Sequence, residues 1–224
     1  RQARPGSLAP ERFGFSPSGD RLHLVVTSPA AGGDELFVRD YGGTVFGAPT
    51  RVSGAPAGDI DAVSWSPRGD RLAFARGSGL EVARLGPGGP AAPVRVADTL
   101  GGPAPLAHRW MCGGDRLVFS SVQAGSDAAR LEVAELGPSV QVTSLVASPL
   151  VAPGVESFRV APNGRHVAFT QSTTSRRLEG FVVEDVCAGG ATPARLHAPF
   201  MADDLLAWTS GMLGTRPAAF WGAG

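Results

Sequence analysis

The stretch Phe15-Ser16-Pro17-Ser18-Gly19-Asp20-Arg21-Leu22-His23-Leu24-Val25 decides the fold, because the chain repeats it with small changes. It returns as Trp65-Ser66-Pro67-Arg68-Gly69-Asp70-Arg71-Leu72-Ala73-Phe74-Ala75, and again in residues 110–120 and 160–170. A fifth, degenerate copy in residues 200–209 keeps the hydrophobic residues at both ends and lacks one turn residue. The chain is therefore built from an internal repeat.

The spacing and the local pattern of the repeat both indicate β-structure. Aligned at Asp20, Asp70, Asp115, Arg165 and Asp204, the copies lie 50, 45, 50 and 39 residues apart. Such periods are typical of four-stranded propeller blades rather than of helical repeats. Each copy also reads as a hairpin, since a strand end, a tight turn with Pro and Gly, and an alternating apolar run follow one another.

The pattern predicts one all-β domain over residues 1–224, a β-propeller of four-stranded antiparallel blades. Repeats fall near 12–53, 58–97, 104–147, 153–197 and 198–221, the last incomplete. No window shows helical periodicity over three turns, and residues 86–90, rich in Gly and Pro, are expected to be a turn. The five visible repeats form either a small closed ring or part of a ring of six or seven blades, and a ring hides sheet edges.

Charge and composition exclude some partners. The chain has 20 basic and 20 acidic residues, so its net charge favours neither nucleic acid nor an anionic membrane surface. No segment approaches the roughly 20 apolar residues of a membrane span. The chain begins at Arg1 without a segment of signal-peptide type, which suggests a processed form or a piece of a larger protein.

Two cysteines, Cys112 and Cys187, lie in neighbouring repeats. A disulfide between them would require an oxidising compartment. Their distance cannot be derived from the sequence, so two unrelated thiols are the favoured interpretation, and pairing is the alternative.

The repeated phrase resembles the TolB-type, WD40-like (PD40) β-propeller repeat, whose signature is aromatic-Ser-Pro-Asp-Gly-basic-x-Leu-Ala-Phe. The first two copies match it nearly in full, with Ser18 and Arg68 where the family usually has Asp, and the other three match in part. The resemblance implies a bacterial protein of the periplasm, cell envelope or secreted fraction. Related repeats occur in the partner-binding TolB protein and in the propellers of prolyl-oligopeptidase-type hydrolases. TolB itself adds an amino-terminal α/β domain, for which these 224 residues show no pattern.

Several motifs have a structural explanation that is simpler than a chemical one. Arg68-Gly69-Asp70 spells an adhesion tripeptide, but it occupies the repeated turn. The repeated aspartates Asp20, Asp70, Asp115 and Asp204 are expected to accept hydrogen bonds from turn amides, because a calcium site needs several oxygen donors within one short loop.

No catalytic, cofactor-binding or metal-binding residues are predicted. The four histidines share no metal-ligand spacing: His23, His108, His166 and His197. His23 is expected to be a partly buried strand residue. The sequence shows no nucleophile elbow and no phosphate-binding loop before a helix.

Aromatic residues recur at fixed places in the repeat and are expected to form the core between blades. They are Phe15, Trp65, Phe74, Trp110, Phe119, Phe169 and Trp208.

The function predicted from these patterns is a non-catalytic scaffold. It would bind a protein partner, or a small ligand, through its loops or its central channel. The alternative is the propeller of a prolyl-oligopeptidase-type peptidase or a glycan-active propeller enzyme.

Overall fold

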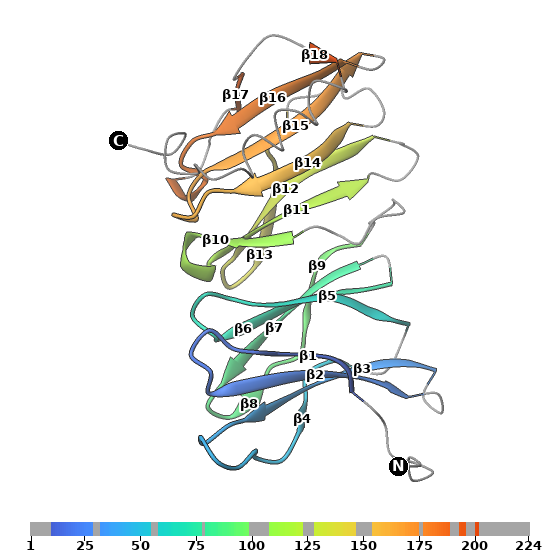
Figure 1. The fold of residues 1–224 in the computed structure, drawn as a ribbon, viewed down its shortest axis with the longest axis vertical. Helices are drawn as coiled ribbons and strands as arrows, with labels where there is room; N and C mark the ends of the chain where they lie inside the picture. The colour runs from blue at the N-terminus through green and yellow to red at the C-terminus, as the bar shows by residue number, and fades with distance from the viewer. Residues whose placement is uncertain are drawn as a thin grey trace.

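The computed structural model describes residues 10–28, 32–54, 58–77, 79–98, 108–122, 128–146, 154–174, 177–188, 193–195 and 200–201. They form four antiparallel sheets that follow one another along the chain and along the long axis of the molecule (Figure 1). We call them blades 1 to 4. Within the described residues the only helical segments are two single 3₁₀ turns, η2 (Cys112–Gly114) and η3 (Val186–Ala188). The predicted all-β architecture of four-stranded antiparallel blades is confirmed.

Each blade contains a four-stranded meander in which consecutive strands pair. Blade 1 comprises β1 (Pro10–Phe15), β2 (Arg21–Ser28), β3 (Gly33–Asp40) and β4 (Thr50–Arg51). Blade 2 comprises β5 (Ile60–Trp65), β6 (Arg71–Arg76), β7 (Gly79–Gly86), β8 (Gly89–Pro90) and β9 (Val94–Ala97). Blade 3 comprises β10 (His108–Met111), β11 (Arg116–Val122), β12 (Ala129–Leu136) and β13 (Val140–Ser144). Blade 4 comprises β14 (Val155–Val160), β15 (Val167–Thr174), β16 (Arg177–Val183), β17 (Pro193–Arg195) and β18 (Phe200–Met201). In blades 2 and 4 the fifth short strand, β9 or β18, pairs with the third strand of that meander.

Two segments differ from the sequence-based expectation or extend beyond it. Residues 86–90 were predicted to be a turn, yet Gly86 pairs with Gly89 and Leu85 with Pro90, so only Pro87 and Gly88 form the turn. Pro90 is tolerated because it ends a two-residue edge strand, where a missing N–H costs little. The fifth repeat lies outside the described residues except for β18, which pairs with β16 of blade 4.

The repeated turn is held by a serine that an aspartate orients. The hydroxyl oxygen of Ser16 accepts the amide of Arg21 at 3.1 Å, and its proton is donated to Asp20 at 2.8 Å. Hydrogen bonds from Ser18 and Ser16 hold the pKa of Asp20 below its usual value. Asp20 was expected to accept turn amides directly, so the structure corrects that detail. A serine hydroxyl can accept the amide and donate to the carboxylate at once.

The same arrangement of serine and aspartate recurs in blade 2 and is absent from the corresponding turn of blade 3. Ser66 accepts the amide of Arg71 at 3.1 Å and donates to Asp70 at 2.8 Å. Asp115 instead pairs with arginines of blade 2, because Met111, which has no hydroxyl, stands where the serine would be. Asp204 lies outside the described residues.

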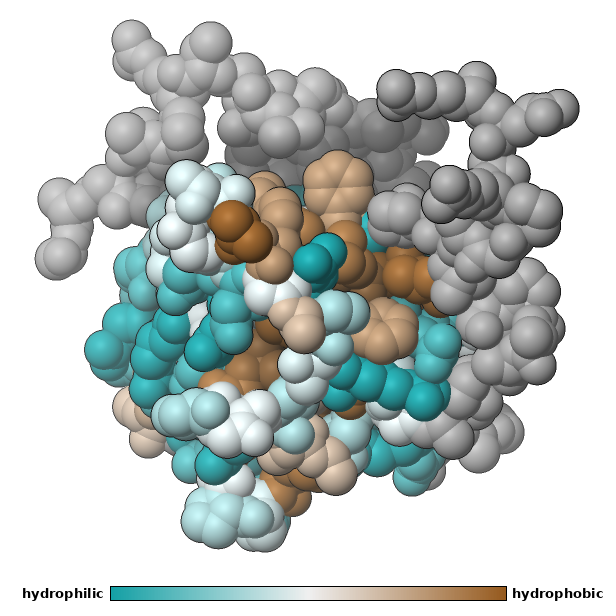
Figure 2. Space-filling view, turned by 90° about the horizontal axis from the view of Figure 1, so that it is seen from below, coloured by the Kyte–Doolittle hydropathy of each residue, from teal (hydrophilic) through white to brown (hydrophobic). Residues whose placement is uncertain are grey.

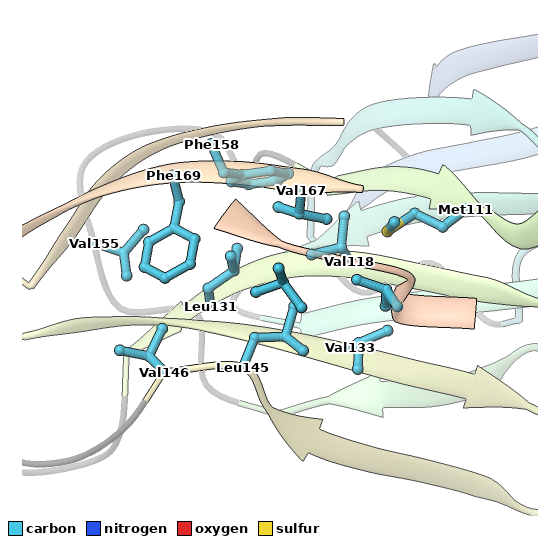
Figure 3. Close-up of a cluster of buried hydrophobic side chains, with 12 residues drawn as sticks. Met111, Val118, Leu131, Val133, Leu145, Val146, Val155, Phe158, Val167 and Phe169 are labelled. Carbon is cyan, nitrogen blue, oxygen red and sulfur yellow. The ribbon is translucent and has the colours of Figure 1, made fainter. Parts of the chain in front are cut away.

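The core lies between the blades. Alternation along each strand sends one set of side chains to the preceding blade and the other to the next. Three hydrophobic clusters result, one at each junction. Figure 3 shows the cluster between blades 3 and 4, where Val118 and Leu131 meet Val167 and Phe169.

The recurring aromatic residues confirm this packing at most of their positions. Phe74 and Phe119 are fully buried and Phe169 is nearly so. Burial of each such ring stabilises the fold by a few kcal/mol, roughly 2 to 3. Phe15 was expected in the core but is 51% exposed, because no described sheet covers that side of blade 1. Trp208 lies outside the described residues.

Candidate functional site

The first strands of neighbouring blades lie side by side and are joined by indole hydrogen bonds. The Nε1–H of Trp65 donates to the carbonyl oxygen of Gly14 at 3.2 Å. Trp110, at the same place in the next repeat, donates to the hydroxyl oxygen of Ser64 at 3.0 Å. Gly14 and Ser64 hold equivalent positions, so the contact repeats from blade to blade. We call the row of β1, β5, β10 and β14 the first-strand edge.

Ser64 also contacts a buried histidine at this edge. Its hydroxyl oxygen lies 2.7 Å from Nε2 of His108, which is 3% exposed. Trp110 donates to the same oxygen, and a hydroxyl has one donor and two acceptor positions, so it can hold both contacts at once. The Ser64 hydroxyl is thus occupied on both sides, and it ties blade 2 to blade 3.

An arginine joins blades 1 and 2 at the same edge. The guanidinium of Arg12 lies 3.2 Å from the carboxylate of Asp34 and 2.7 Å from that of Asp61. Asp34 is buried and also accepts the amide of Ile60 at 3.0 Å and the hydroxyl of Thr27 at 2.7 Å. Burial opposes ionisation of Asp34, but these donors outweigh it and leave its pKa below the usual value.

Three of the first strands begin with a register shift. It lies between Pro10 and Arg12 in β1, between Asp61 and Ser64 in β5, and between Val155 and Ser157 in β14. In β5 the backbone is strained as well, since Ala62 has a φ of 49°. Such bulges redirect side chains at sheet edges and beside functional sites.

In β14, the first strand of blade 4, the bulge carries an acidic residue. Glu156 is the residue between Val155 and Ser157, and its side chain is among the exposed ones. Partial desolvation raises the pKa of Glu156 above its usual value. The bulge therefore sets an acidic side chain at the opening end of β14.

Two exposed arginines stand at equivalent positions of adjacent first strands. Arg109 in β10 and Arg159 in β14 directly precede Trp110 and Val160, where blades 1 and 2 carry Gly14 and Ser64. Each bends back so that Nη1 donates to the carbonyl of the preceding residue, at 2.8 and 2.9 Å. In the part of the chain that the structure describes, neither guanidinium pairs with a carboxylate. Most of their hydrogen-bonding capacity faces solvent.

A groove lies between blades 1 and 2, away from the first-strand edge. It has a volume of about 340 Å³ and is lined by the Arg21–Asp40 ion pair, Val38, Thr50 and the hairpin of residues 85–90. Its volume lies near the lower limit of small-molecule sites, about 300 Å³. Its ionic groups already bind one another, since Arg21 Nε lies 3.2 Å from Asp40.

The histidines do not gather. His23 is buried between blades 1 and 2, next to Trp65, and its burial lowers its pKa to about 4. His108 binds Ser64, and His166 contacts Asn163 in the turn of blade 4. Among the described residues, no three His, Cys, Asp or Glu side chains come close enough to hold a metal ion. His197 lies outside them.

The adhesion-like tripeptide is part of the junction between blades. Arg68 donates to the carbonyl of Gly113 at 2.6 Å and pairs with Asp115 in blade 3. The interpretation of Arg68-Gly69-Asp70 as a turn is confirmed. The arginine that follows each turn aspartate also crosses to the next blade. Arg21 reaches the carbonyl of Gly69 at 3.3 Å, and Arg71 reaches that of Gly114 at 2.7 Å.

Cys112 and Cys187 form a disulfide, which overturns the expectation of two unrelated thiols. Their Cα atoms lie 5.5 Å apart, within the range that a disulfide spans. The sequence concealed this because the two residues are separated by 75 positions. The repeat brings the η2 turn of blade 3 against η3 of blade 4, where the Cys112 amide also donates to Gly164 at 3.0 Å.

Comparison with known proteins supports the fold. No protein-family model matches the chain, and no curated protein matches it. A candidate 6-phosphogluconolactonase from Bacteroides fragilis has a similar solved structure, with a TM-score of 0.52 and 15% identity. The match covers 87% of this chain and 55% of that one. At this identity the likeness shows the fold alone, which is that of propeller blades.

TolB structures are also among the similar ones. That of Acinetobacter baumannii gives a TM-score of 0.47 at 17% identity, with 79% of this chain and 41% of that one covered. A TolB candidate from Agrobacterium tumefaciens gives 0.47 at 14% identity, with 84% and 65% covered. This chain thus spans about 41% to 65% of the length of these three structures. In the described residues, no helix is long and apolar enough to cross a membrane.

The sequence analysis did not single out Arg109, Arg159 or the Arg12 contacts. A signal was present, because alignment of the repeats places both arginines in the column just before the aromatic position. The bulges had no such signal, since they arise from strand pairing.

Proposed function

We propose that this propeller is a binding scaffold that holds a protein partner at its first-strand edge and at the loops beside it. The observation that carries the proposal is the pair Arg109 and Arg159. They project from adjacent blades at the same position, exposed and without a carboxylate partner among the described residues.

The chemistry of these side chains indicates what they would bind. A guanidinium presents several N–H donors in a planar fork that matches a carboxylate. Two such groups on a rigid support favour a partner segment that carries acidic side chains. The support is rigid because the indole, arginine and disulfide contacts fix each blade against the next.

The proposed location is the bacterial periplasm, cell envelope or secreted fraction. A disulfide between two blades persists in an oxidising compartment and is rare in the cytosol. This agrees with the periplasmic setting implied by the resemblance to TolB-type repeats.

The test measures binding of a fluorescent acidic peptide, an octamer that alternates Glu and Gly, by anisotropy at low salt. Substitution of both residues, Arg109→Gln and Arg159→Gln, is expected to weaken binding at least tenfold. The control is Arg39→Gln, which removes an arginine on β3, away from the first-strand edge, and should leave binding unchanged. Equal binding by all three proteins would reject the first-strand edge as the site.

A second measurement addresses the catalytic alternative. The close contact of Ser64 and His108 could also serve a hydrolase. Hydrolysis of peptide or glycan substrates that disappears in Ser64→Ala would favour that alternative over the scaffold. We expect no such activity, because the serine hydroxyl is engaged by Trp110 as well.

A further inference from the structure

The outward side of blade 1 carries apolar side chains that no described sheet covers. Val25 and Leu36 point toward blade 2 and belong to the cluster at that junction. Strand alternation therefore turns Phe13, Phe15 and Leu24 to the opposite side. Phe13 is 67% exposed and Phe15 is 51% exposed. Figure 2 looks at the molecule from the blade 1 end and shows apolar residues in the middle of this face, with hydrophilic ones mostly to the left of them and below.

The equivalent side of every other blade is buried. Leu24 corresponds to Phe74, Phe119 and Phe169, which are 0%, 0% and 3% exposed. Each of these rings packs against the preceding blade. Blade 1 thus has the same kind of surface that blades 2, 3 and 4 each pack against the preceding blade.

The polar part of the same contact is also present on blade 1. In blades 2 and 3 the turn carbonyls of Gly69 and Gly114 accept an arginine from the preceding blade. Gly19 is the corresponding turn residue of blade 1 and has the same left-handed backbone, with a φ of 76°. Among the described residues no arginine reaches its carbonyl.

We propose that the outward face of blade 1 is the docking surface for a further four-stranded blade of the same polypeptide. Such a blade would present aliphatic side chains to Phe15 and Leu24, and an arginine to the carbonyl of Gly19. It would also carry a polar group opposite Arg39, which stands where blades 2 and 3 have Ala83 and Ala134. The guanidinium of Arg39 lies over the ring of Phe46, 5.4 Å from its centroid, and has no carboxylate partner in the described part.

Two other occupants fit less well. The terminal segments outside the described residues, 1–9 and 202–224, are each shorter than the span of blade 1, residues 10–51. A second copy that continued the array of blades would have to offer the outward side of its blade 4. There Thr170 and Val182 are already buried, at 6% and 9%, and His166 replaces the arginine that would reach Gly19. The chain also spans only 55% of the Bacteroides fragilis propeller, which has room for more blades.

The test uses the complete native polypeptide with Phe15→p-benzoylphenylalanine, a photo-cross-linking residue, in an equal mixture of ¹⁴N- and ¹⁵N-labelled protein. After irradiation, mass spectrometry identifies the linked peptides. We expect links to a segment outside these 224 residues, always between peptides of the same isotope. Val45→p-benzoylphenylalanine, at a site 71% exposed, is the control and should give no such link.

Three outcomes would overturn the proposal. Mixed-isotope links would show a second copy. Links to residues 1–9 or 202–224 alone would show that a terminal segment covers the face. An absence of links from position 15, with the same absence for Phe13→p-benzoylphenylalanine and native circular dichroism spectra for both variants, would show an uncovered face.

Discussion

The indole nitrogen of Trp110 lies 3.0 Å from the hydroxyl oxygen of Ser64, and this contact links the first strands of blades 2 and 3. Trp110→Phe keeps an aromatic ring and removes the donor. We expect it to lower the free energy of unfolding by about 1 kcal/mol, the usual net value of one hydrogen bond. Urea denaturation measures this. In a double-mutant cycle with Ser64→Ala the two losses should not add; strictly additive losses would show that the contact contributes nothing.

The Cys112–Cys187 disulfide should contribute more than any single hydrogen bond. It closes a loop with a sequence separation of 75 residues, so its loss is expected to cost roughly 4 kcal/mol through the entropy of the unfolded chain. The measurement compares urea denaturation with and without dithiothreitol. The double variant Cys112→Ser and Cys187→Ser serves as the control and should be insensitive to the reductant. A wild-type protein equally stable in both conditions would contradict this prediction.

Acid should destabilise the junction of blades 1 and 2 through His23. Burial lowers the pKa of this histidine to about 4 from 6.5, so the folded protein excludes a proton that the unfolded chain binds between these values. Stability should fall as the pH drops from 6.5 to 4, by about 3 kcal/mol from this group, and its contribution should level off below pH 4. His23→Leu should lose this part of the pH dependence, measured as thermal unfolding across the window. Parallel pH profiles for the two proteins would contradict it.

Two glycines with nearly equal backbone angles should respond differently to alanine. Gly154 and Gly19 have φ values of 78° and 76°. A Cβ on Gly154 would lie 2.3 Å from the carbonyl oxygen of Ala129, whereas one on Gly19 would meet open space. Gly19→Ala should cost about 1 kcal/mol for the left-handed conformation alone. Gly154→Ala should cost at least about 2 kcal/mol more, because backbone must move. Similar melting temperatures for the two variants would refute the close approach.

The fold could be predicted because each repeat contains the residues that mark its own strand ends and turn. One strand ends at Phe15, Gly19 permits the turn, and the next strand begins at Arg21, all within a few residues. Such local signals do not depend on the rest of the molecule. The exceptions depend on tertiary context. Gly89 and Pro90 form a strand only because β7 is there to pair with them.

The candidate site was harder to predict, because it depends on contacts between repeats. Two of its features are contacts between residues of different blades: the Cys112–Cys187 disulfide and the ion pair of Arg12 with Asp61. A third, the exposure of Phe15, arises because no described sheet covers that face of blade 1. Column-by-column alignment of the repeats finds equivalent positions such as Arg109 and Arg159. It cannot reveal which of them face solvent.

In the described residues, each of two kinds of contact between blades keeps one direction along the chain. Arg21 and Arg71 reach forward to Gly69 and Gly114, while Trp65 and Trp110 reach back to Gly14 and Ser64. A tandem duplication of one repeat in the gene would therefore copy a donor and its matching acceptor together. Arrays of this kind can lengthen during evolution without inventing a new interface at each step.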